Sequence, residues 1–364
     1  MGESFKVPFY AKASLILIGL FTFVSILFIA QSIIVPIVYA TIIAILLNPL
    51  VQFFVNKKLN LFLSIFLVLG SVALIIFIGF ALLSTQLDEF SDALPSILDK
   101  FYKMFNSFIK WISESFNIST RNINKYIDTT KSDVLSNSGS SIALTLNSLG
   151  NLLFMLILIP VYVFMILFYK KHLVEFLYKL FGNDNQHEVK EVISSSKGVI
   201  QKYLIALLME VAIVAVLNTI GLYILGIKYA LVLGILGATL NIVPYLGGLV
   251  AMIIYSIITL VTKDSYTYVI YVLILYSIIQ FIDNNIIMPK LVGSKVKINA
   301  FIAIIAVIVG GAIWGVGGMF VSLPIIAILK IVFDHIDSAK PWGFLFGDTS
   351  PPLIVIAKEK PQSK

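Results

Sequence analysis

The sequence predicts an all-α, polytopic helical membrane protein with about five to six full spans and two broken or re-entrant helical hairpins. Hydrophobic residues make up 59% of the 364-residue chain and charged residues only 12%, against roughly 45–50% and 25% in soluble domains. Several apolar runs reach the roughly 20 residues that cross a bilayer. Two further runs in the C-terminal half are interrupted by Pro and Gly, which break helices.

The full spans are predicted in order from the N-terminus. Lys6 and Lys12 precede the first apolar run, as in a signal peptide. No small-residue cleavage site closes that run, so we expect an uncleaved first span. Hydropathy places the full spans near 14–34, 36–54, 60–84, 149–169, 204–226 and 267–287.

The two interrupted runs, 229–262 and 300–333, predict helical hairpins. Each arm has about 14–16 residues, or roughly 21–24 Å of helix, which is short of a bilayer core of roughly 30 Å. Irregular backbone at that depth occurs only inside protein or beside a water-filled cavity, and paired breaks point to a transporter's binding site. Tight helix packing through small residues is the alternative reading. The predicted tip residues are Pro244, Tyr245, Gly247, Gly248, Gly310, Gly311, Gly315, Gly317, Gly318 and Pro324.

Two polar segments predict amphipathic helices outside the membrane. Residues 88–147 begin with apolar side chains at helical spacing from Phe90 to Ile112, and become Ser- and Asn-rich from Ser132 to Ser141. The helix fits either the membrane surface or a neighbouring subunit. The expected organisation is 1–87 (N-terminal scaffold spans), 88–148 (extracytoplasmic segment), 149–203 (a span plus a cytoplasmic interfacial helix over 172–203), 204–337 (transport unit) and 338–364 (a partly disordered cytoplasmic tail).

The distribution of positive charge predicts the orientation. With the N-terminus inside, most of the 26 Lys and Arg residues fall in cytoplasmic segments. The largest group assigned to the outside lies in the long 88–147 segment, where charge has a weaker orienting effect. We therefore expect a multi-pass protein of the cell (inner) membrane with both termini cytoplasmic.

Only two acidic residues lie well inside apolar runs, Glu210 and Asp283. A carboxylate at the bilayer centre costs roughly 2.5–3.5 kcal/mol on insertion scales, so it usually faces a cavity, a partner or a proton path. Gln280, Asp283 and Asn284 are spaced to share one helix face. The competing readings are a structural hydrogen-bond network around Asp283 and an interfacial, snorkelling Glu210. The predicted pathway residues are Asp283, Asn284, Asn285, Gln280, Asn241 and Glu210.

Composition and motifs argue against an enzyme. The chain has no Cys, and His172, His187 and His335 lie far apart without ligand spacing, so no metal site or cofactor is expected. The glycines of 310–318 do not follow a strand, which argues against a phosphate loop. The net charge is +7, and the basic residues lie in short loops beside apolar spans. This pattern is typical of residues that set membrane orientation rather than of a nucleic-acid-binding surface.

Four motifs occur in order along nearly the whole chain. They are Val35-Pro36 with Leu46-Leu47-Asn48-Pro49-Leu50, then Asn241 to Gly248, then Asp283-Asn284-Asn285 with Pro289, and finally Gly310 to Gly318 with Leu323-Pro324. Together they resemble signatures of the autoinducer-2 exporter family of bacterial polytopic membrane proteins. Asp283 stands where that family usually has Glu, and Gly248 stands where Pro is frequent.

This resemblance implies a homo-oligomeric transporter, with a pentamer as one option, that exports small polar metabolites such as autoinducer-2. Some family members are instead linked to Na⁺(Li⁺)/H⁺ antiport, for which Asp283 would be the titrating carboxylate. The expected partners are thus a small polar solute or a monovalent cation or proton, and the lipid bilayer. A membrane scaffold or sensor that uses the 88–147 segment is a further alternative.

Overall fold

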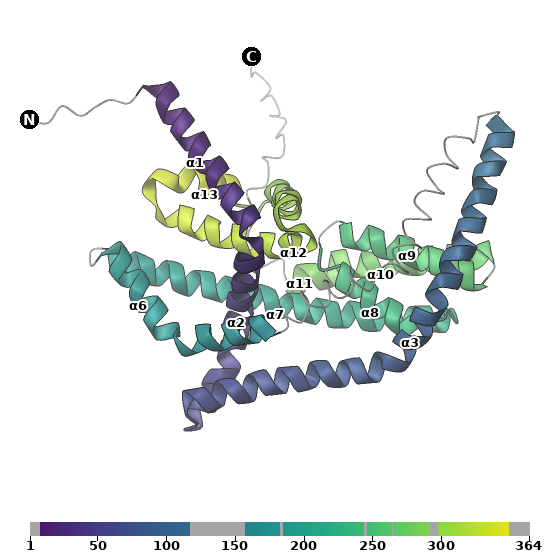
Figure 1. Cartoon of the computed structure of the whole chain (residues 1–364), viewed down its shortest axis with the longest axis horizontal. Coiled ribbons are helices and arrows are strands. Elements are labelled where there is room, and N and C mark those ends of the chain that lie inside the picture. Colours follow the sequence, from purple (N-terminus) through teal and green to yellow (C-terminus); the bar gives the residue numbers. More distant parts are fainter. Residues whose placement is uncertain are drawn as a thin grey trace, which may run out of the picture. The chain divides into compact units, whose positions relative to one another are not determined.

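The computed structural model describes residues 8–116, 157–182, 185–243, 246–263, 265–291 and 298–348 (Figure 1). All regular structure in these residues is helical, apart from one isolated bridge between Ile298 and Gly347. The chain forms two compact units. Unit 1 combines residues 1–28, 175–204 and 292–364, and unit 2 combines 29–174 and 205–291. The all-α prediction is confirmed.

Seven described helices are long and apolar enough to cross a membrane. An eighth candidate is a pair of helices, Ile157–Phe168 and α6 (Lys170–Phe181), which meet at a bend of 66°. The polytopic prediction is therefore confirmed. The seven helices are α1 (Phe9–Ile29), α2 (Gln31–Asn56), α3 (Leu61–Phe116), α7 (Gln186–Ile224), α9 (Leu246–Lys263), α10 (Tyr266–Ile282) with its continuation to Leu291, and α12 (Ala300–His335).

In unit 2, α2, α3 and the Ile157–Phe168 helix share one apolar core. Small residues such as Ala40 and Ala44 let the helices approach closely, and Val68 and Val163 fill the space between them. The buried Asn48 accepts a hydrogen bond from Lys170 Nζ at 2.9 Å. This bond ties the second half of α2 to the first residue of α6.

The third span and the amphipathic helix after it are one helix. The sequence predicts a span that ends near 84 and a separate segment from 88, whereas α3 runs unbroken from Leu61 to Phe116. At 1.5 Å per residue its 56 residues extend about 84 Å. The remainder of the predicted 88–147 segment, including the Ser- and Asn-rich stretch, lies outside the described residues.

The outer part of α3 packs against the first predicted hairpin of its own chain. Ile97 is buried in the same core as residues of α8 (Ala230–Leu240), α9 and α10. Phe90 meets Tyr229 edge-to-face with ring centroids 5.3 Å apart. Lys100 Nζ donates to the Val261 carbonyl at 3.3 Å. The sequence predicts that this helix lies on the membrane surface or on another subunit. This face of α3 instead packs on the first predicted hairpin of the same chain.

The predicted interfacial helix over 172–203 is divided between two helices. Its first part lies in α6, and its second part is continuous with the following span in α7. The buried stripe of α7 continues across the predicted boundary through Tyr203, Leu207, Glu210 and Val214. These residues recur every three to four positions, so a single helix buries all of them on one face.

In unit 1, α12 is followed by a short 3₁₀ turn, Asp337–Ala339, and by α13 (Lys340–Phe346). Asn299 caps α12 by accepting from the Ile302 N–H at 3.1 Å, and its Nδ2 donates to the Leu345 carbonyl. The start of the predicted tail is therefore helical and packs on α12, while its last residues lie outside the described part of the chain. Lys340 is hydrogen-bonded to Asp337 and lowers the pKa of that exposed carboxyl.

Candidate functional site

Hairpin 1, formed by α8 and α9, lies in unit 2 (Figure 1). Tyr255 of α9 donates its hydroxyl to the Leu233 carbonyl of α8 at 2.9 Å, and its ring lies where Gly237 leaves room. At the turn, a Cβ on Gly247 would overlap the Leu240 carbonyl. The two arms are thus packed tightly by small residues on one side and an aromatic residue on the other. Pro244 and Tyr245 of the predicted tip lie outside the described residues.

The helix after hairpin 1 changes its winding at the predicted acidic motif. α10 continues into a π turn over Asp283–Ile287 and then into α11 (Met288–Leu291). Pro289 lacks an N–H, so it cannot donate to the carbonyl of Asn285 as an α-helix requires. The wider turn stays within the helix and shifts side chains around its axis. Single π turns inside α-helices occur frequently at functional sites.

Asp283 is buried within this π turn, with 2% of its surface exposed. Its Oδ2 accepts a hydrogen bond from Asn241 Nδ2 at 2.9 Å. Asn241 follows the last residue of α8, so this bond joins the tip of hairpin 1 to the π turn. Among the described residues, Asp283 Oδ1 is buried and has no hydrogen-bond partner.

Other polar groups gather at the same tip. Tyr276 of α10 donates its hydroxyl to the Gly248 carbonyl at 2.7 Å. A Cβ on Gly248 would lie 2.9 Å from that hydroxyl, 3.4 Å from Asn241 Oδ1 and 3.6 Å from Gln280 Oε1. Gly248 therefore faces three oxygen atoms from two helices. Tyr276 is a member of this group that sequence reasoning missed, although it lies one turn before Gln280.

Glu210 joins the site from α7. It exposes 3% of its surface, and its Oε2 is buried without a partner among the described residues. Val214, one turn further along α7, shares a core with Ala238 of α8 and Ile287 of the π turn. Glu210, Asn241 and Asp283 each lie about one helical turn from a member of that core. Glu210 is thus a core residue and not a snorkelling one.

The two amides after Asp283 point elsewhere. Asn284 and Asn285 are exposed, and Asn285 Nδ2 donates to the Phe281 carbonyl of its own helix at 2.9 Å. The regular helical spacing that groups Asn284 with Gln280 and Asp283 does not hold here, because the π turn alters the winding.

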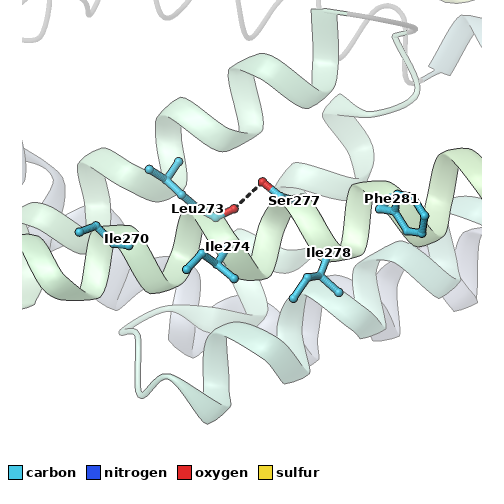
Figure 2. A pocket seen from close by; sticks show the side chains of 6 residues that line it. All are labelled: Ile270, Leu273, Ile274, Ser277, Ile278 and Phe281. Carbon is cyan, nitrogen blue, oxygen red and sulfur yellow. Dashed lines mark hydrogen bonds between the residues drawn. The ribbon is translucent and has the colours of Figure 1, made fainter.

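The other face of α10 is apolar. Figure 2 shows a shallow pocket along that face, in which Ser277 is the sole polar side chain and bonds its own helix at Leu273. Ile270, Ile274 and Ile278 are each more than half exposed there. Since Tyr276 and Gln280 of α10 lie beside Gly248 of hairpin 1, we place the candidate site there and not in this pocket.

Hairpin 2 lies in unit 1 and is built by α12 alone. The helix reverses at Trp314 (φ −130°, ψ 18°) and Gly315, whose positive φ of 63° favours glycine. Beside the turn, a Cβ on Gly310 would lie 2.5 Å from the Gly318 carbonyl oxygen, and one on Gly311 would lie 2.5 Å from Met319 Cε. These contacts show that the two arms pack directly on each other.

The remaining predicted tip residues of hairpin 2 have different surroundings. Gly317 lies two residues past the reversal, whereas Pro324 is buried further along the second arm, away from the turn. Trp314 donates its indole N–H to the Leu27 carbonyl at 2.9 Å. Leu27 lies in the last turn of α1, where carbonyls lack intrahelical donors. This anchor of the turn was not predicted from the sequence.

Hairpin 1 and Asp283 thus belong to unit 2, and hairpin 2 belongs to unit 1. The predicted transport unit, residues 204–337, includes residues of both units. That the two hairpins flank one common site remains a prediction, as does the role of each pathway residue.

Known proteins resemble this chain along most of its length. The model for the AI-2E family transporter matches residues 15–338. The AI-2 transport protein TqsA of Escherichia coli is 25% identical over 333 residues, which cover 88% of this chain and 90% of TqsA. The putative transport protein YueF of Bacillus subtilis is 24% identical over 310 residues, or 83% of each chain.

A shorter match connects this chain with the putative transport protein YrrI of Bacillus subtilis, which is 29% identical over 133 residues. That match covers 36% of this chain and 37% of YrrI. The family model, by contrast, extends from the first span through both hairpins. Together with the apolar helices, it makes the protein a multi-pass membrane transporter. The chain therefore belongs to the AI-2E transporter family.

Proposed function

We propose that this chain is a secondary transporter that exports small polar metabolites, such as autoinducer-2, by alternating access. The observation that carries this proposal is the buried Asp283, held by Asn241 at the tip of hairpin 1 and set in a π turn. A carboxylate in an apolar span costs roughly 2.5–3.5 kcal/mol, so its presence there fits a polar cargo or ion. The name of the relative TqsA supports autoinducer-2 as the first solute to test.

The short arms of the hairpins support a gating role. α8 has 11 residues, or about 16 Å of helix, which is half of a bilayer core. We propose that both hairpins and the Asp283 helix move against the first three spans, the outer part of α3 and residues 172–203. Hairpin 1 opens from the outside and hairpin 2 from the cytoplasm, with both termini cytoplasmic. Hairpins of opposite orientation can exchange roles between inward- and outward-facing states.

Single cysteines test the gating role, because the natural chain contains none. Gly247 leaves no room for a side chain, so Leu246 and Val316 are better positions, with exposed fractions of 45% and 69%. We expect substrate or ion to protect Leu246→Cys and Val316→Cys from a membrane-impermeant thiol reagent. Phe9→Cys, which is 88% exposed on α1, is the control and should stay unaffected. Unchanged labelling at both tips would remove them from the pathway.

Reconstituted vesicles test the cargo. Flux of autoinducer-2 and of Na⁺ and H⁺ should be measured in the same preparation. Asp283→Asn keeps the size of the side chain and an oxygen for Asn241, so we expect a folded protein with at least tenfold slower flux. Asp337→Asn changes a fully exposed carboxylate and serves as the control. Equal flux through Asp283→Asn and the wild type would show that Asp283 has no part in transport.

Na⁺(Li⁺)/H⁺ antiport is the second candidate function. The buried Asp283 Oδ1, which has no partner among the described residues, favours it because it leaves an oxygen for a cation or a proton. An imposed Na⁺ gradient would then alkalinise or acidify the vesicle lumen in the absence of any organic solute. Sodium-driven pH changes that persist in Asp283→Asn would refute this candidate.

We also propose that the chain is a homo-oligomer. The outer part of α3 exposes Phe105, Phe108 and Trp111, and Phe108 and Trp111 stack with centroids 6.1 Å apart. Exposed aromatic residues of this kind are typical of interfaces. The same surface is the basis of the scaffold or sensor alternative. If the double variant Phe108→Ser/Trp111→Ser keeps its solute flux but no longer binds a partner, that result would favour the scaffold or sensor alternative.

A further inference from the structure

α6 presents a row of exposed apolar side chains. None of its 12 residues is buried. Leu173, Phe176 and Leu180 recur at intervals of three and four residues, so they share one face of the helix. Tyr169, at the bend before α6, continues this row. These four side chains form the α6 stripe, and each exposes between 45% and 61% of its surface. A contiguous apolar row of this kind marks a surface that contacts a membrane or a protein.

A second face of α6 is charged. Lys171, Glu175 and Lys179 follow one another at intervals of four residues, so they lie together on a face separate from the α6 stripe. Glu175 pairs with Lys179 at 2.9 Å, and the Lys179 side chain is still 76% exposed. Together with Lys170, the helix carries three Lys and one Glu, which leaves it positively charged. Lys on one face, with Leu and Phe on the other, is typical of helices that lie in a membrane interface.

The bend before α6 directs the helix along the membrane surface. The preceding helix, Ile157–Phe168, meets α6 at 66°. Membrane-spanning helices are tilted by roughly 20° on average, and such a tilt brings α6 close to the membrane plane. Lys170 donates to the buried Asn48 of α2 at 2.9 Å, which fixes the start of α6 to that span. The orientation expected from the charge distribution places the bend on the cytoplasmic side.

The charge of α6 favours lipid over a protein partner. The cores of protein interfaces are depleted in Lys and Glu, whereas these two residue types supply four of the 12 residues of α6. The cytoplasmic leaflet contains anionic phospholipids, whose surface potential attracts Lys side chains. A long Lys side chain keeps its charged end at the headgroups while its stem lies along apolar surface. The membrane interface therefore suits both faces of α6 at once.

We propose that α6 lies in the cytoplasmic leaflet with the α6 stripe among the acyl chains, and that Lys171 and Lys179 bind the phosphate groups of anionic phospholipids. Interfacial helices bury their apolar face roughly 5–10 Å into the boundary between headgroups and acyl chains. The bond from Lys170 to Asn48 is a positioning contact, because it sets where α6 leaves the preceding span. The inference concerns a lipid contact of the protein and is independent of the solute that it transports.

Spin labels on single cysteines measure how deep α6 lies, because the natural chain contains no Cys. The full-length protein is reconstituted into vesicles of phosphatidylcholine and phosphatidylglycerol. Collisions of each label with O₂, which concentrates among acyl chains, are compared with collisions with a water-soluble nickel complex. We expect labels at Phe176→Cys and Leu180→Cys to meet mainly O₂, and a label at Glu175→Cys to meet mainly the nickel complex.

Other surroundings of the α6 stripe give different patterns. Mainly nickel collisions at Phe176→Cys and Leu180→Cys would place the stripe in water. Few collisions with either reagent would mean that a protein covers the stripe, for example a second copy of this chain. Either pattern would overturn the placement of α6 in the leaflet.

Binding of a fluorescent phosphatidylglycerol to the purified full-length protein in a zwitterionic detergent tests the headgroup contact. Each Lys near an anionic lipid surface strengthens binding about fivefold. We therefore expect Lys171→Gln and Lys179→Gln each to raise the Kd for phosphatidylglycerol about fivefold. The Kd for a fluorescent phosphatidylcholine should stay the same in both variants, because its headgroup has no net charge.

Lys103→Gln in α3 is the matched control. Lys103 pairs with Asp99 four residues before it at 2.8 Å and is 75% exposed, so it resembles Lys179 and its partner Glu175 in both spacing and exposure. Lys103→Gln should leave the Kd for phosphatidylglycerol unchanged. An unchanged Kd in Lys171→Gln and Lys179→Gln, or an equal rise in Lys103→Gln, would overturn the headgroup contact at α6.

Discussion

Gly310 offers a direct test of how hairpin 2 reverses. A Cβ at this position would lie 2.5 Å from the Gly318 carbonyl oxygen, 2.9 Å from its carbon and 3.1 Å from Ser322 Cβ. Since real Cβ atoms essentially never come within 3.0 Å of such atoms, Gly310→Ala must push the arms apart by about half an ångström. The opposing atoms are backbone, so no side chain can rotate away.

Two opposing effects set the change in stability that Gly310→Ala causes. Overpacking a tight contact costs about 1–3 kcal/mol. Replacing Gly by Ala inside a helix returns about 0.5–1 kcal/mol. The net loss of stability for Gly310→Ala is therefore about 1–2 kcal/mol. Gly70→Ala in α3 is the matched control, because nothing lies within 4 Å of its Cβ. It should gain about 0.5–1 kcal/mol from helix propensity alone.

The assay is thermal unfolding of both variants in the same detergent. A difference of about 2 kcal/mol corresponds to roughly 2–4 °C in Tm between Gly310→Ala and Gly70→Ala for a chain of 364 residues. Gly318→Ala should behave like Gly310→Ala, because its Cβ would overlap the Gly310 carbonyl from the other arm. Equal Tm values for Gly310→Ala and Gly70→Ala would mean that the two arms do not meet at Gly310, which would refute the reversal at Trp314 and Gly315.

Five further variants test three other contacts. Tyr255→Phe removes the hydrogen bond to the Leu233 carbonyl and should cost about 1 kcal/mol in thermal unfolding, while Gly237→Ala, whose Cβ overlaps the Tyr255 ring, should cost more. Ile97→Ala should lower stability by about 2–4 kcal/mol and Lys100→Met by much less, and equal effects would contradict the packing of α3 on hairpin 1. Trp314→Phe removes the bond to Leu27 and should speed thiol labelling of Val316→Cys; an unchanged rate would mean that this bond does not hold the turn.

The sequence was sufficient to predict the helical class, the two hairpins and the burial of Asp283. These features depend on local signals, namely apolar run length, Pro and Gly, and the cost of a charge in an apolar span. The Trp314–Gly315 reversal, for example, lies in the middle of the predicted glycine-rich break.

Features that depend on tertiary contacts were not predictable. The bond of Asn241 to Asp283 spans 42 positions, and nothing in the spacing along one helix indicates it. α3 continues beyond residue 84 because no helix breaker separates its apolar half from its amphipathic half, and Pro95 is accommodated within the helix. The exposure of Asn284 follows from the π turn, which regular helical periodicity does not include.

The contacts at the tip of hairpin 1 also indicate how a ligand could control it. Two side-chain hydrogen bonds hold the tip to the Asp283 helix: Asn241 to Asp283, and Tyr276 to the Gly248 carbonyl. A bond to a charged group contributes about 1.5–3 kcal/mol and a neutral bond about 1 kcal/mol. Complete reversal of a two-state equilibrium from 1:99 to 99:1 needs about 5.5 kcal/mol. A cation or solute that binds Asp283 in place of Asn241 removes this hydrogen bond from the tip. Loss of the bond would therefore supply up to about half of the 5.5 kcal/mol. The rest has to come from contacts that the ligand makes only when the tip is open, which is why binding at Asp283 and movement of hairpin 1 should be measured on the same variants.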